Sequence, residues 1–396
     1  LTTGELVFRP TVSSFGAERF YITRGAPAKL PAAFPAARVE GLTLSAPAST
    51  LAPAIRLRLD EKTGGIASLV YGERELVDGK AATALNDYFY LPGSDLKGLQ
   101  RNGPVKIAIK EKGPLIASLV VESEAPGCRR LTREVRLHAV RNYVEVINRV
   151  DKAPVRAKEG VHFGFGFNVP GGVVRMDVPW AVVRPETDQI PGACRNWFTV
   201  QRWVDISNDD YGVTWVTPDA PLVQIGGITA NLIGSLSDIR HWTEHLEPSP
   251  TLYSWAMNNH WHTNYRAEQE GNTVFRYFIF PHQDRYSEAA ATQLGVECGQ
   301  PLLVLPARGP LPQAPVRLSN HSVMVSVLKP SDDGKGMVLR LFGLSDKAEK
   351  VTLAWSEPRP ARVFFSDNSE RPRQACGDSV EVPAHSLVTL RAEWEN

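Results

Sequence analysis

The segment VHFGFGFNV, residues 161–169, alternates large apolar residues with small or polar ones. Side chains of a β-strand point to its two faces in turn, so the five large residues share one face: Val161, Phe163, Phe165, Phe167 and Val169. An apolar row of this size must be buried. Glycine weakens the interior of a strand, so Gly164 and Gly166 predict that another backbone or a ligand lies close to the opposite face.

Strand patterns recur on both sides of this segment. The expected strands are Ile55–Leu59, Ile66–Tyr71, Val105–Lys110, Leu115–Glu122, Leu131–His138, Tyr143–Val150, Tyr211–Val216 and Phe275–Phe280. Gly64-Gly65 and Gly113-Pro114 separate neighbouring strands and predict tight turns. One short segment, 287–294, is typical of a helix. Many antiparallel strands in roughly 250 residues predict an all-β fold with one large sandwich.

A proline-rich stretch separates this sandwich from a second set of strands. Its prolines are Pro301, Pro306, Pro310, Pro312 and Pro315, which indicate a stiff, extended connector. Beyond it, the expected strands are Val323–Leu328, Met337–Phe342, Val351–Trp355, Val363–Phe365, Val380–Val382 and Leu387–Arg391. Short strands at this spacing predict a small β-sandwich.

These boundaries give four expected parts. Residues 36–300 form the large sandwich, 301–315 the linker and 316–396 the small sandwich. Residues 1–35 are expected to hold the last strands of a preceding domain, within 1–23, followed by an Ala/Pro-rich linker. Because the chain starts without Met, we expect it to be a fragment or a processed product. Residues 1–23 would then form the edge of an interrupted domain, and such an unpaired edge predicts an apolar surface that promotes self-association.

Composition excludes several classes of partner. The 396 residues include 44 basic and 43 acidic side chains, which are interspersed, so no basic stripe for nucleic acid is expected. No apolar run approaches the ~20 residues that cross a membrane. The four cysteines have no Cys-x-x-Cys spacing and leave the redox compartment open: Cys128, Cys194, Cys298 and Cys376.

The densest group of unusual residues is YSWAMNNHWHTNY, residues 253–265. Aromatic rings stack on the apolar faces of sugars and amides bond to hydroxyl groups, so this composition resembles a sugar-binding wall. The candidate contacts are Trp255, Asn258, Asn259 and Trp261. The alternative is a buried polar corner whose amides bond only to backbone groups, and the sequence leaves both open.

Histidine spacing in this region permits metal binding but does not favour it. His260 and His262 would share the face of a strand, and His241 and His245 stand four apart. A zinc site needs three or four ligands in a tetrahedral array, and no carboxylate or thiol stands at a supporting spacing. We therefore expect no metal ligands in this chain.

A second aromatic group, NDYFYLPG, spans residues 86–93. Pro92-Gly93 predicts a bend, Tyr88 and Tyr90 share one face, and Asp87 and Phe89 share the other. One interpretation is a loop that presents Tyr88 and Asp87 to a ligand. The other is an aromatic plug in the core with a hydrogen-bonded hydroxyl group.

The stretch QRWVDISNDDYG, residues 201–212, contains three aspartates. A pair of carboxylates could serve as acid and base in glycosidic hydrolysis. A Ser-Asn-Asp-Asp run before a strand is more typical of a turn, which is the favoured interpretation here.

In order and spacing, these motifs resemble the C-terminal half of bacterial-type family 38 α-mannosidases. The matching motifs are the Gly-Gly hairpin in Asp60–Tyr71, Tyr-x-x-Leu-Pro at Tyr88–Pro92, Arg-Trp-Val-Asp at Arg202–Asp205, and Met-Asn-Asn-x-Trp-x-Thr-Asn at Met257–Asn264. Residues Phe15–Phe20 resemble the strand that leads out of the middle of such an enzyme. The resemblance implies a mutarotase-like β-supersandwich followed by a small β-sandwich.

The resemblance also implies what this chain lacks. In the family, the zinc site and the aspartate nucleophile belong to an N-terminal α/β-barrel with a His-x-Asp-x-Gly-Trp motif. His282-Gln283-Asp284 departs from that motif after its third position, so zinc and catalysis are expected in a missing barrel. Tyr88 matches the tyrosine that reaches the mannose site in this family. No position here matches the arginine with which some members hold a distal sugar.

The expected function is therefore that of the non-catalytic portion of a zinc-dependent retaining α-mannosidase. It would complete the pocket for a mannose-containing glycan, support the barrel, and be inactive alone. One alternative is a free-standing carbohydrate-binding module that uses the 253–265 wall. Another is a mutarotase-like epimerase, which needs a His and a Glu facing each other; His162 and Glu159 are the candidates.

Overall fold

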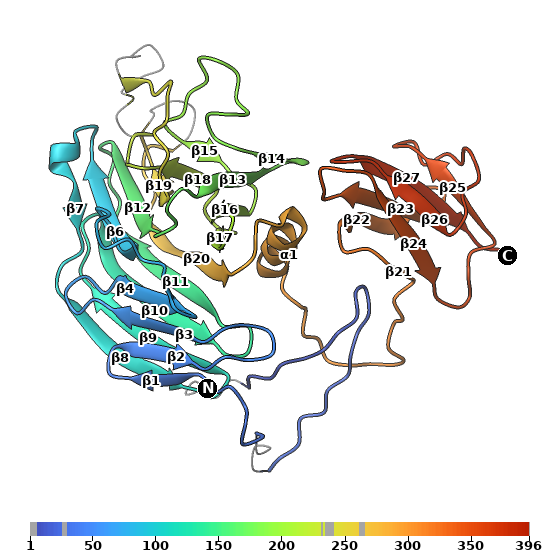
Figure 1. Cartoon of the computed structure of the whole chain (residues 1–396), viewed down its shortest axis with the longest axis horizontal. Coiled ribbons are helices and arrows are strands. Elements are labelled where there is room, and N and C mark those ends of the chain that lie inside the picture. Colours follow the sequence, from blue (N-terminus) through green and yellow to red (C-terminus); the bar gives the residue numbers. More distant parts are fainter. Residues whose placement is uncertain (1–5, 26–29, 231–232, 234–240, 261–265, 396) are drawn as a thin grey trace. The chain divides into compact units, whose positions relative to one another are not determined.

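The computed structural model describes residues 6–25, 30–230, 233, 241–260 and 266–395 (Figure 1). Within these residues the chain forms β-strands, one short 3-10 helix, η1 (Leu96–Gly98), and one α-helix. It divides into two compact units, a larger one built mainly on residues 30–286 and a smaller one built mainly on residues 301–396. The all-β prediction is confirmed, and each unit is described by itself.

The first sheet of the larger unit has eleven antiparallel strands. In spatial order they are β1 (Arg38–Glu40), β2 (Thr43–Ala46), β3 (Ile55–Leu59), β4 (Ile66–Tyr71), β6 (Leu85–Pro92), β12 (Glu159–Gly166), β19 (Thr251–Asn258), β18 (Leu222–Ile225) and β15 (Phe198–Thr199). Two short strands are added at the side, β5 (Arg74–Glu75) on β4 and β7 (Gln100–Arg101) on β6.

The second sheet has nine antiparallel strands. Their order is β14 (Ala181–Val183), β13 (Val173–Val178), β16 (Trp203–Ser207), β17 (Gly212–Val216), β20 (Gly271–His282), β11 (Tyr143–Lys152), β10 (Cys128–His138), β9 (Ile116–Ser123) and β8 (Val105–Lys112). Figure 1 shows β1 to β4 lying across β8 to β11. The two sheets thus form the large sandwich that the strand patterns predict.

Strand β12 lies in the middle of this sandwich. The ring of Phe163 is 5.8 Å from that of Tyr277, and Phe165 is 5.0 Å from Trp215, both on the opposite sheet. The prediction that the apolar row is buried is confirmed. On the other face, a Cβ atom on Gly166 would lie only 2.3 Å from the carbonyl oxygen of Thr83. The backbone of Thr83 therefore covers Gly166, as one of the two sequence-based alternatives required, while the side chains of Thr83 and Phe89 cover Gly164.

Buried charges also lie between the sheets. The Nζ atom of Lys152 on β11 is 2.7 Å from a carboxylate oxygen of Glu159 on β12, and both side chains are almost fully buried. Arg133 on β10 is fully buried and donates hydrogen bonds to the carbonyl oxygens of Asn86 and Thr63. Buried charges of this kind need such partners, because removing an unpaired charge from water would cost roughly several kcal/mol per ion.

The outermost strands of the two sheets are short or irregular. β1 and β14 have three residues each and β15 has two. The long outer strand, β8, contains eight residues, among them Lys106, Lys110 and Lys112. Its pairing with β9 shifts register between Ile109 and Glu111.

Helix α1 (Glu288–Gly299) follows β20 and extends beyond the expected segment, 287–294. Its C-terminal half packs on β16, because a Cβ atom on Gly295 would lie 2.8 Å from Cδ1 of Trp203. A search of the described residues finds no helix with the length and apolar character needed to cross a membrane.

The smaller unit contains two sheets. One has the order β21 (Val316–Leu318), β24 (Glu349–Trp355) and β26 (Ser379–Val382); the other has the order β22 (Val323–Pro330), β23 (Gly336–Gly343), β27 (Leu387–Glu393) and β25 (Arg362–Ser366). All six strands expected after the linker are present, whereas β21 was not predicted. Their inward side chains form a separate core that includes Leu339, Leu341, Val351 and Leu390.

The strands expected within residues 1–23 are absent from the described part, residues 6–23. The rings of Phe8 and Phe20 lie 4.9 Å apart, and Arg19 donates a hydrogen bond to the carbonyl oxygen of Gly309. An alternating pattern does not form a strand without a neighbour to complete its hydrogen bonds. Many apolar side chains of residues 6–23 and of residues 302–305 are exposed: Leu6, Phe8, Phe15, Phe20, Tyr21, Ile22, Leu302, Leu303, Val304 and Leu305.

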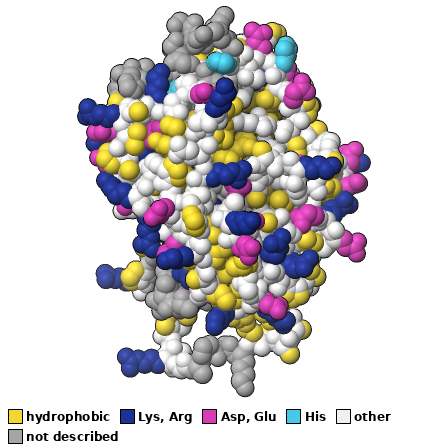
Figure 2. Space-filling view, turned by 90° about the vertical axis from the view of Figure 1, so that its left-hand side faces the viewer, with side chains coloured by type: hydrophobic (Ala, Val, Ile, Leu, Met, Phe, Trp, Pro, Cys, Tyr) yellow, Lys and Arg dark blue, Asp and Glu magenta, His cyan; other side chains and the backbone are white. Residues whose placement is uncertain are grey.

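On the face drawn in Figure 2, the charged side chains that are coloured do not form a stripe of one sign. On the face drawn in Figure 2, Lys and Arg side chains alternate with Asp and Glu, and apolar side chains lie between them. This face offers no basic surface of the kind that neutralises a row of phosphates.

Candidate functional site

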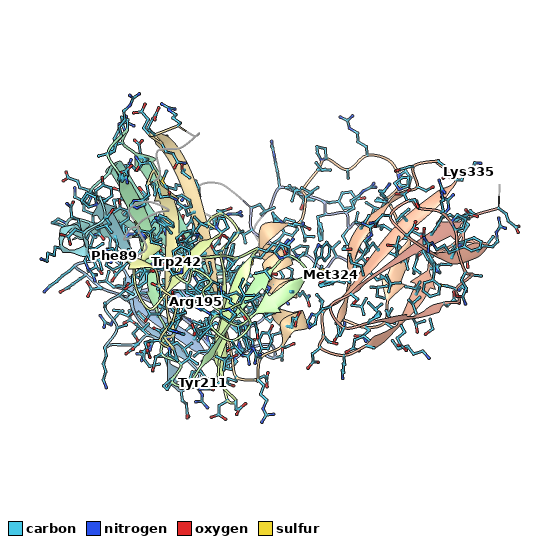
Figure 3. The ribbon with its side chains drawn as sticks, turned by 90° about the horizontal axis from the view of Figure 1, so that it is seen from above. Phe89, Arg195, Tyr211, Trp242, Met324 and Lys335 are labelled. Carbon is cyan, nitrogen blue, oxygen red and sulfur yellow. The ribbon has the colours of Figure 1, made fainter. Side chains whose placement is uncertain are left out.

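Residues 86–92 belong to strand β6, so the expectation that they form a loop was wrong. The bend at Gly93 is present, with φ of 70°. Asp87 pairs with Gly164, and Phe89, labelled in Figure 3, pairs with His162. Strand pairing at this site left no room for a loop, although the turn signal after Pro92 was correct.

Tyr88 is fully buried in the core between the sheets. Its hydroxyl group donates a hydrogen bond of 2.6 Å to the carbonyl oxygen of Pro126 and lies 3.3 Å from Sγ of Cys128. Burial raises the pKa of Tyr88 far above its usual value. This is the environment described above as an aromatic plug, and a role for Tyr88 in substrate contact stays a prediction.

Asp87 lies on the opposite face of β6 and is also buried. Its carboxylate accepts hydrogen bonds from the Arg101 guanidinium at 2.9 Å and from the backbone N–H of Ala84 at 3.0 Å. The Arg101 guanidinium in turn lies 4.5 Å from the centre of the Phe89 ring. A Cβ atom on Gly65 would lie 2.3 Å from Oδ1 of Asp87, so only glycine fits there. In this chain Asp87 holds local structure together.

Trp255 lies on the same face as Asp87, on β19. Its ring is parallel to that of His162 at 6.3 Å, and the Trp197 ring meets it edge-on at 5.9 Å. Trp255 is almost fully buried. Asn258, the last residue of β19, is half-buried and pairs with Gly160.

The amide of Asn259 makes three hydrogen bonds, all with backbone groups. Its oxygen accepts from the N–H of Glu159 at 2.8 Å, and its nitrogen donates to the carbonyl oxygens of Val155 at 2.6 Å and Ala267 at 3.1 Å. This arrangement is the buried polar corner of the alternative interpretation. Trp261 lies outside the described residues.

Three of the residues predicted to contact a sugar lie on one face of the first sheet, and Tyr88 lies on the other. Asp87, Trp255 and Asn258 occupy neighbouring strands and one face of the first sheet, because residues paired across a ladder share a face. Tyr88 points to the opposite face, into the core. Sugar contact by this set stays a prediction.

His162 is the most unusual buried group on that face. It is fully buried, and no hydrogen-bond partner for either ring nitrogen is present in the part of the chain that the structure describes. Burial lowers the pKa of His162 to about 3, so the ring is neutral. Glu159 pairs instead with Lys152 between the sheets. The facing His and Glu required by the epimerase hypothesis are not formed by these two residues.

No three His, Cys, Asp or Glu side chains in the described ranges gather where they could hold a metal ion. His245 bonds to Glu186 at 2.9 Å, and His260 bonds to the carbonyl oxygen of Ile233 at 2.7 Å. The zinc that the family resemblance implies thus has no donor set in these ranges.

The aspartate-rich stretch 201–212 forms β16 and a turn, as favoured above. The side-chain oxygen of Asn208 accepts hydrogen bonds from the N–H groups of Asp210 and Tyr211, which is an Asx turn. Asp205 is fully buried and accepts from Ser207 at 2.6 Å and Thr214 at 2.8 Å. Asp205 and Asp209 therefore do not act as a pair of exposed carboxylates.

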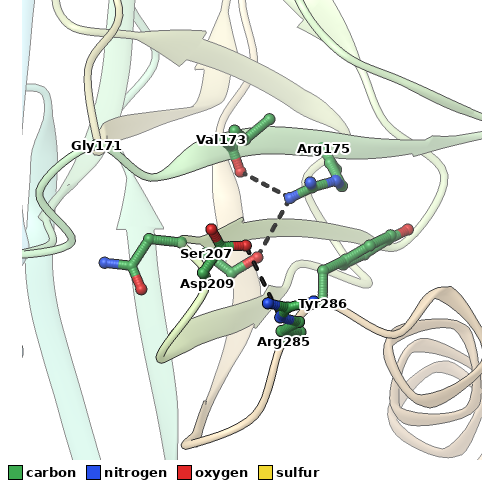
Figure 4. A pocket seen from close by; sticks show the side chains of 8 residues that line it. Gly171, Val173, Arg175, Ser207, Asp209, Arg285 and Tyr286 are labelled. Carbon is green, nitrogen blue, oxygen red and sulfur yellow. Dashed lines mark hydrogen bonds and ion pairs between the residues drawn. The ribbon is translucent and has the colours of Figure 1, made fainter.

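A cavity of about 330 Å³ lies beside this turn and was not predicted from the sequence (Figure 4). It is lined by Gly171, Val173, Arg175, Ser207, Asn208, Asp209, Arg285 and Tyr286. These residues come from three segments that are far apart in the sequence, so no local sequence pattern predicts the cavity. One signal in the sequence could have indicated the cavity: Arg175 is a charged residue within the strand-like segment 173–178, VVRMDV.

Comparison with known proteins agrees with the fold described above. Residues 322–383 match the family described as "Glycosyl hydrolases family 38 C-terminal beta sandwich domain". The curated protein "Putative mannosylglycerate hydrolase" of Halalkalibacterium halodurans is 24% identical over 204 residues, which are 49% of this chain and 21% of that protein.

Two solved structures from Enterococcus faecalis share the fold. An alpha-mannosidase of strain V583 has 12% sequence identity and a TM-score of 0.60 over 86% of this chain and 41% of that chain. A protein in the glycosyl hydrolase family 38 has 12% identity and a TM-score of 0.63 over 90% of this chain and 45% of that chain.

Together, the match of residues 322–383 and the fold shared with the two structures show what this chain is similar to: the C-terminal β-region of family 38 glycoside hydrolases. The resemblance to the C-terminal region of family 38 glycoside hydrolases is confirmed. The chain spans less than half the length of each of these three proteins.

Proposed function

We propose that this chain is the non-catalytic β portion of a zinc-dependent, retaining α-mannosidase. The observation that carries the proposal is unequal coverage: two matched structures align with 86% and 90% of this chain but 41% and 45% of their own chains. A catalytic domain in the remaining part would supply the zinc ligands and the nucleophile. This chain would complete the pocket for a mannose-containing glycan.

The carboxylates described above support a non-catalytic role. Retaining hydrolysis needs two carboxyl groups about 5–5.5 Å apart, one of them free to attack the sugar. Asp87 is engaged by Arg101, and Asp205 is engaged by Ser207 and Thr214. Both groups are buried as well, so neither offers a free nucleophile.

The exposed apolar segments support association with a further domain. Leu303 and Val304 are 87% and 83% exposed, and Tyr21 and Ile22 are 80% and 85% exposed. Contiguous apolar surface of this kind marks protein–protein contact. We propose that the catalytic domain covers these segments.

The test is reconstitution. The purified chain is expected to hold no stoichiometric zinc and to leave aryl α-mannosides intact, whereas mixing it with the separately expressed upstream domain should produce activity. Leu303→Asp should weaken the association, while Thr352→Asp, at an exposed position of β24, serves as the matched control. One tightly held zinc ion per isolated chain, or turnover by that chain after rigorous purification, would contradict the proposal.

A further inference from the structure

We propose that the cavity beside β13 and β16 binds a small anion through a carboxylate or phosphate group, with Arg175 as the principal contact. The cavity, of about 330 Å³, lies wholly within the larger unit and is shown in Figure 4. Its volume is at the lower end of the range for small-molecule sites, roughly 300–1,000 Å³. The proposal does not depend on the activity proposed above.

Arg175 is held in one orientation by neutral groups. Its guanidinium lies 4.4 Å from the centre of the Tyr286 ring. One guanidinium nitrogen lies 3.4 Å from the carbonyl oxygen of Val173 and 3.3 Å from the hydroxyl oxygen of Ser207 (Figure 4). A guanidinium that is already ordered loses less entropy when it binds a ligand.

The direction of the Ser207 hydrogen bond is fixed by a carboxylate beneath it. Asp205 can only accept, so the Ser207 hydroxyl donates its proton to Oδ1 of Asp205 at 2.6 Å. The lone pairs of Ser207 are then left to accept from Arg175. Asp205 thus positions Arg175 through Ser207 without pairing with it directly.

The carboxylate of Asp205 has two further partners besides Ser207. Its Oδ2 atom accepts from Thr214 at 2.8 Å and lies 3.2 Å from Nε2 of His282. Nδ1 of His282 lies 2.8 Å from the carbonyl oxygen of Asp284. Both ring nitrogens therefore face groups that accept hydrogen bonds, an arrangement that favours the protonated ring and agrees with the raised pKa of His282.

Arg175 forms no ion pair with another described residue. No carboxylate in the described ranges lies within ion-pair distance of its guanidinium, whereas the second cation of the cavity, Arg285, lies 3.9 Å from Asp209. Arg285 and Asp209 are 80% and 92% exposed, and such pairs contribute little, about 0–1 kcal/mol. An anion that enters the cavity can therefore engage Arg175 and draw Arg285 from Asp209.

The geometry of the donors selects the class of ligand. A guanidinium offers two parallel N–H groups, which match the oxygens of a carboxylate or a phosphate. A neutral sugar would leave the charge of Arg175 without a counterion. We therefore expect small anions to bind and neutral sugars of similar size not to bind.

The experiment is isothermal titration calorimetry at low ionic strength with sodium phosphate, sodium glucuronate and methyl α-mannoside. Saturable binding is expected for phosphate or glucuronate but not for the methyl mannoside. Arg175→Met should weaken that binding by about tenfold or more, because a charge-assisted hydrogen bond is lost. Arg58→Met, at an exposed position on β3, should leave it unchanged.

The arms of this experiment distinguish the sources of the anion. Tighter binding of phosphate indicates a phosphorylated ligand, and tighter binding of glucuronate indicates a sugar acid. The proposal is overturned if neither anion binds the folded wild-type protein, or if Arg175→Met binds as tightly as wild type. Ser207→Ala, which keeps the charge but removes the acceptor that orients Arg175, should cause a smaller loss and guards against a folding defect in Arg175→Met.

Discussion

The side-chain amides of Asn86 and Asn148 exchange two hydrogen bonds across the interior of the large sandwich. Nδ2 of Asn86 donates to Oδ1 of Asn148 at 3.0 Å, and Nδ2 of Asn148 donates back at 2.7 Å. Both residues are fully buried, on β6 and β11 of opposite sheets. Asn86 has φ of 67°, a left-handed conformation that asparagine tolerates better than most residues.

This reciprocal pair predicts a large effect of removing one member. Asn148→Ala leaves a donor and an acceptor of Asn86 without partners in an apolar interior. Each such orphaned group costs about 1–3 kcal/mol, so for the two groups we expect the free energy of unfolding of the larger unit to fall by roughly 2–6 kcal/mol. Urea denaturation measures the change. Asn272→Ala, at an exposed position of β20, is the control and should shift stability by less than about 0.5 kcal/mol.

The second prediction concerns the Tyr88 hydroxyl group. Tyr88→Phe removes the donor to the carbonyl oxygen of Pro126 and should lower the free energy of unfolding by about 1–3 kcal/mol. If this hydroxyl acts only in the core, kcat and kcat/KM of the assembled enzyme will stay unchanged. If Tyr88 orients substrate instead, both constants will fall by roughly five- to hundredfold with little loss of stability. Tyr21→Phe, exposed in the isolated chain, is the matched control for the unfolding measurement.

The third prediction concerns the loss of stability at low pH that the buried His162 should cause. Burial lowers the pKa of His162 to about 3, below the unfolded value, so the unfolded chain gains this proton first as the pH falls. The contribution of His162 to stability is present above about pH 6.5 and decreases by about 2–3 kcal/mol between about pH 7 and 4.5. His162→Phe keeps an aromatic ring against Trp255 and should remove this decrease. Equal pH dependence of unfolding in wild type and variant would contradict the assignment.

The fourth prediction has the opposite sign. Burial opposes the charge of His282, but the hydrogen bond and the charge of Asp205 outweigh it and raise the pKa of His282. Its contribution is therefore complete below about pH 6.5 and is lost as the pH rises through the raised folded-state pKa. His282→Gln should destabilise the protein more at about pH 6 than at about pH 9, and His321→Gln, at an exposed position, should not. NMR titration of the ring measures the pKa directly.

Much of the fold was predictable because its signals are local. The Phe163 and Phe165 alternation identified the central strand, and the six strands from Val323 to Arg391 were each bounded by turn residues. Strand β21 was not predicted, because three residues are too few to show an alternating pattern. The strands expected before residue 24 are absent from residues 6–23, since a strand-like sequence does not reveal whether a partner strand exists.

The candidate site was less predictable because its geometry depends on pairing between distant residues. The register of β6 and β12 shifts between Gly164 and Phe165, and sequence does not reveal such shifts. Asp87 was expected beside a ligand but accepts hydrogen bonds from Arg101 and Ala84. Likewise, Arg175, Ser207 and Tyr286 meet only after three strands and the segment that follows β20 have been placed.

The outer strand β8 has a consequence for the colloidal behaviour of the chain. A strand from a second molecule that paired with β8 would meet Lys106, Lys110 and Lys112, and the register shift after Ile109 would interrupt the ladder. The outer strands β1, β14 and β15 of the larger unit are too short to act as templates for fibril growth. In the smaller unit, the eight-residue outer strand β22 has a register shift between Val325 and Val327 and ends in Lys329 and Pro330, which also oppose pairing with a second molecule. Aggregation of the isolated chain should therefore be amorphous and driven by the apolar residues 302–305, so a charge placed in that segment will suppress it and a charge added to β8 will not.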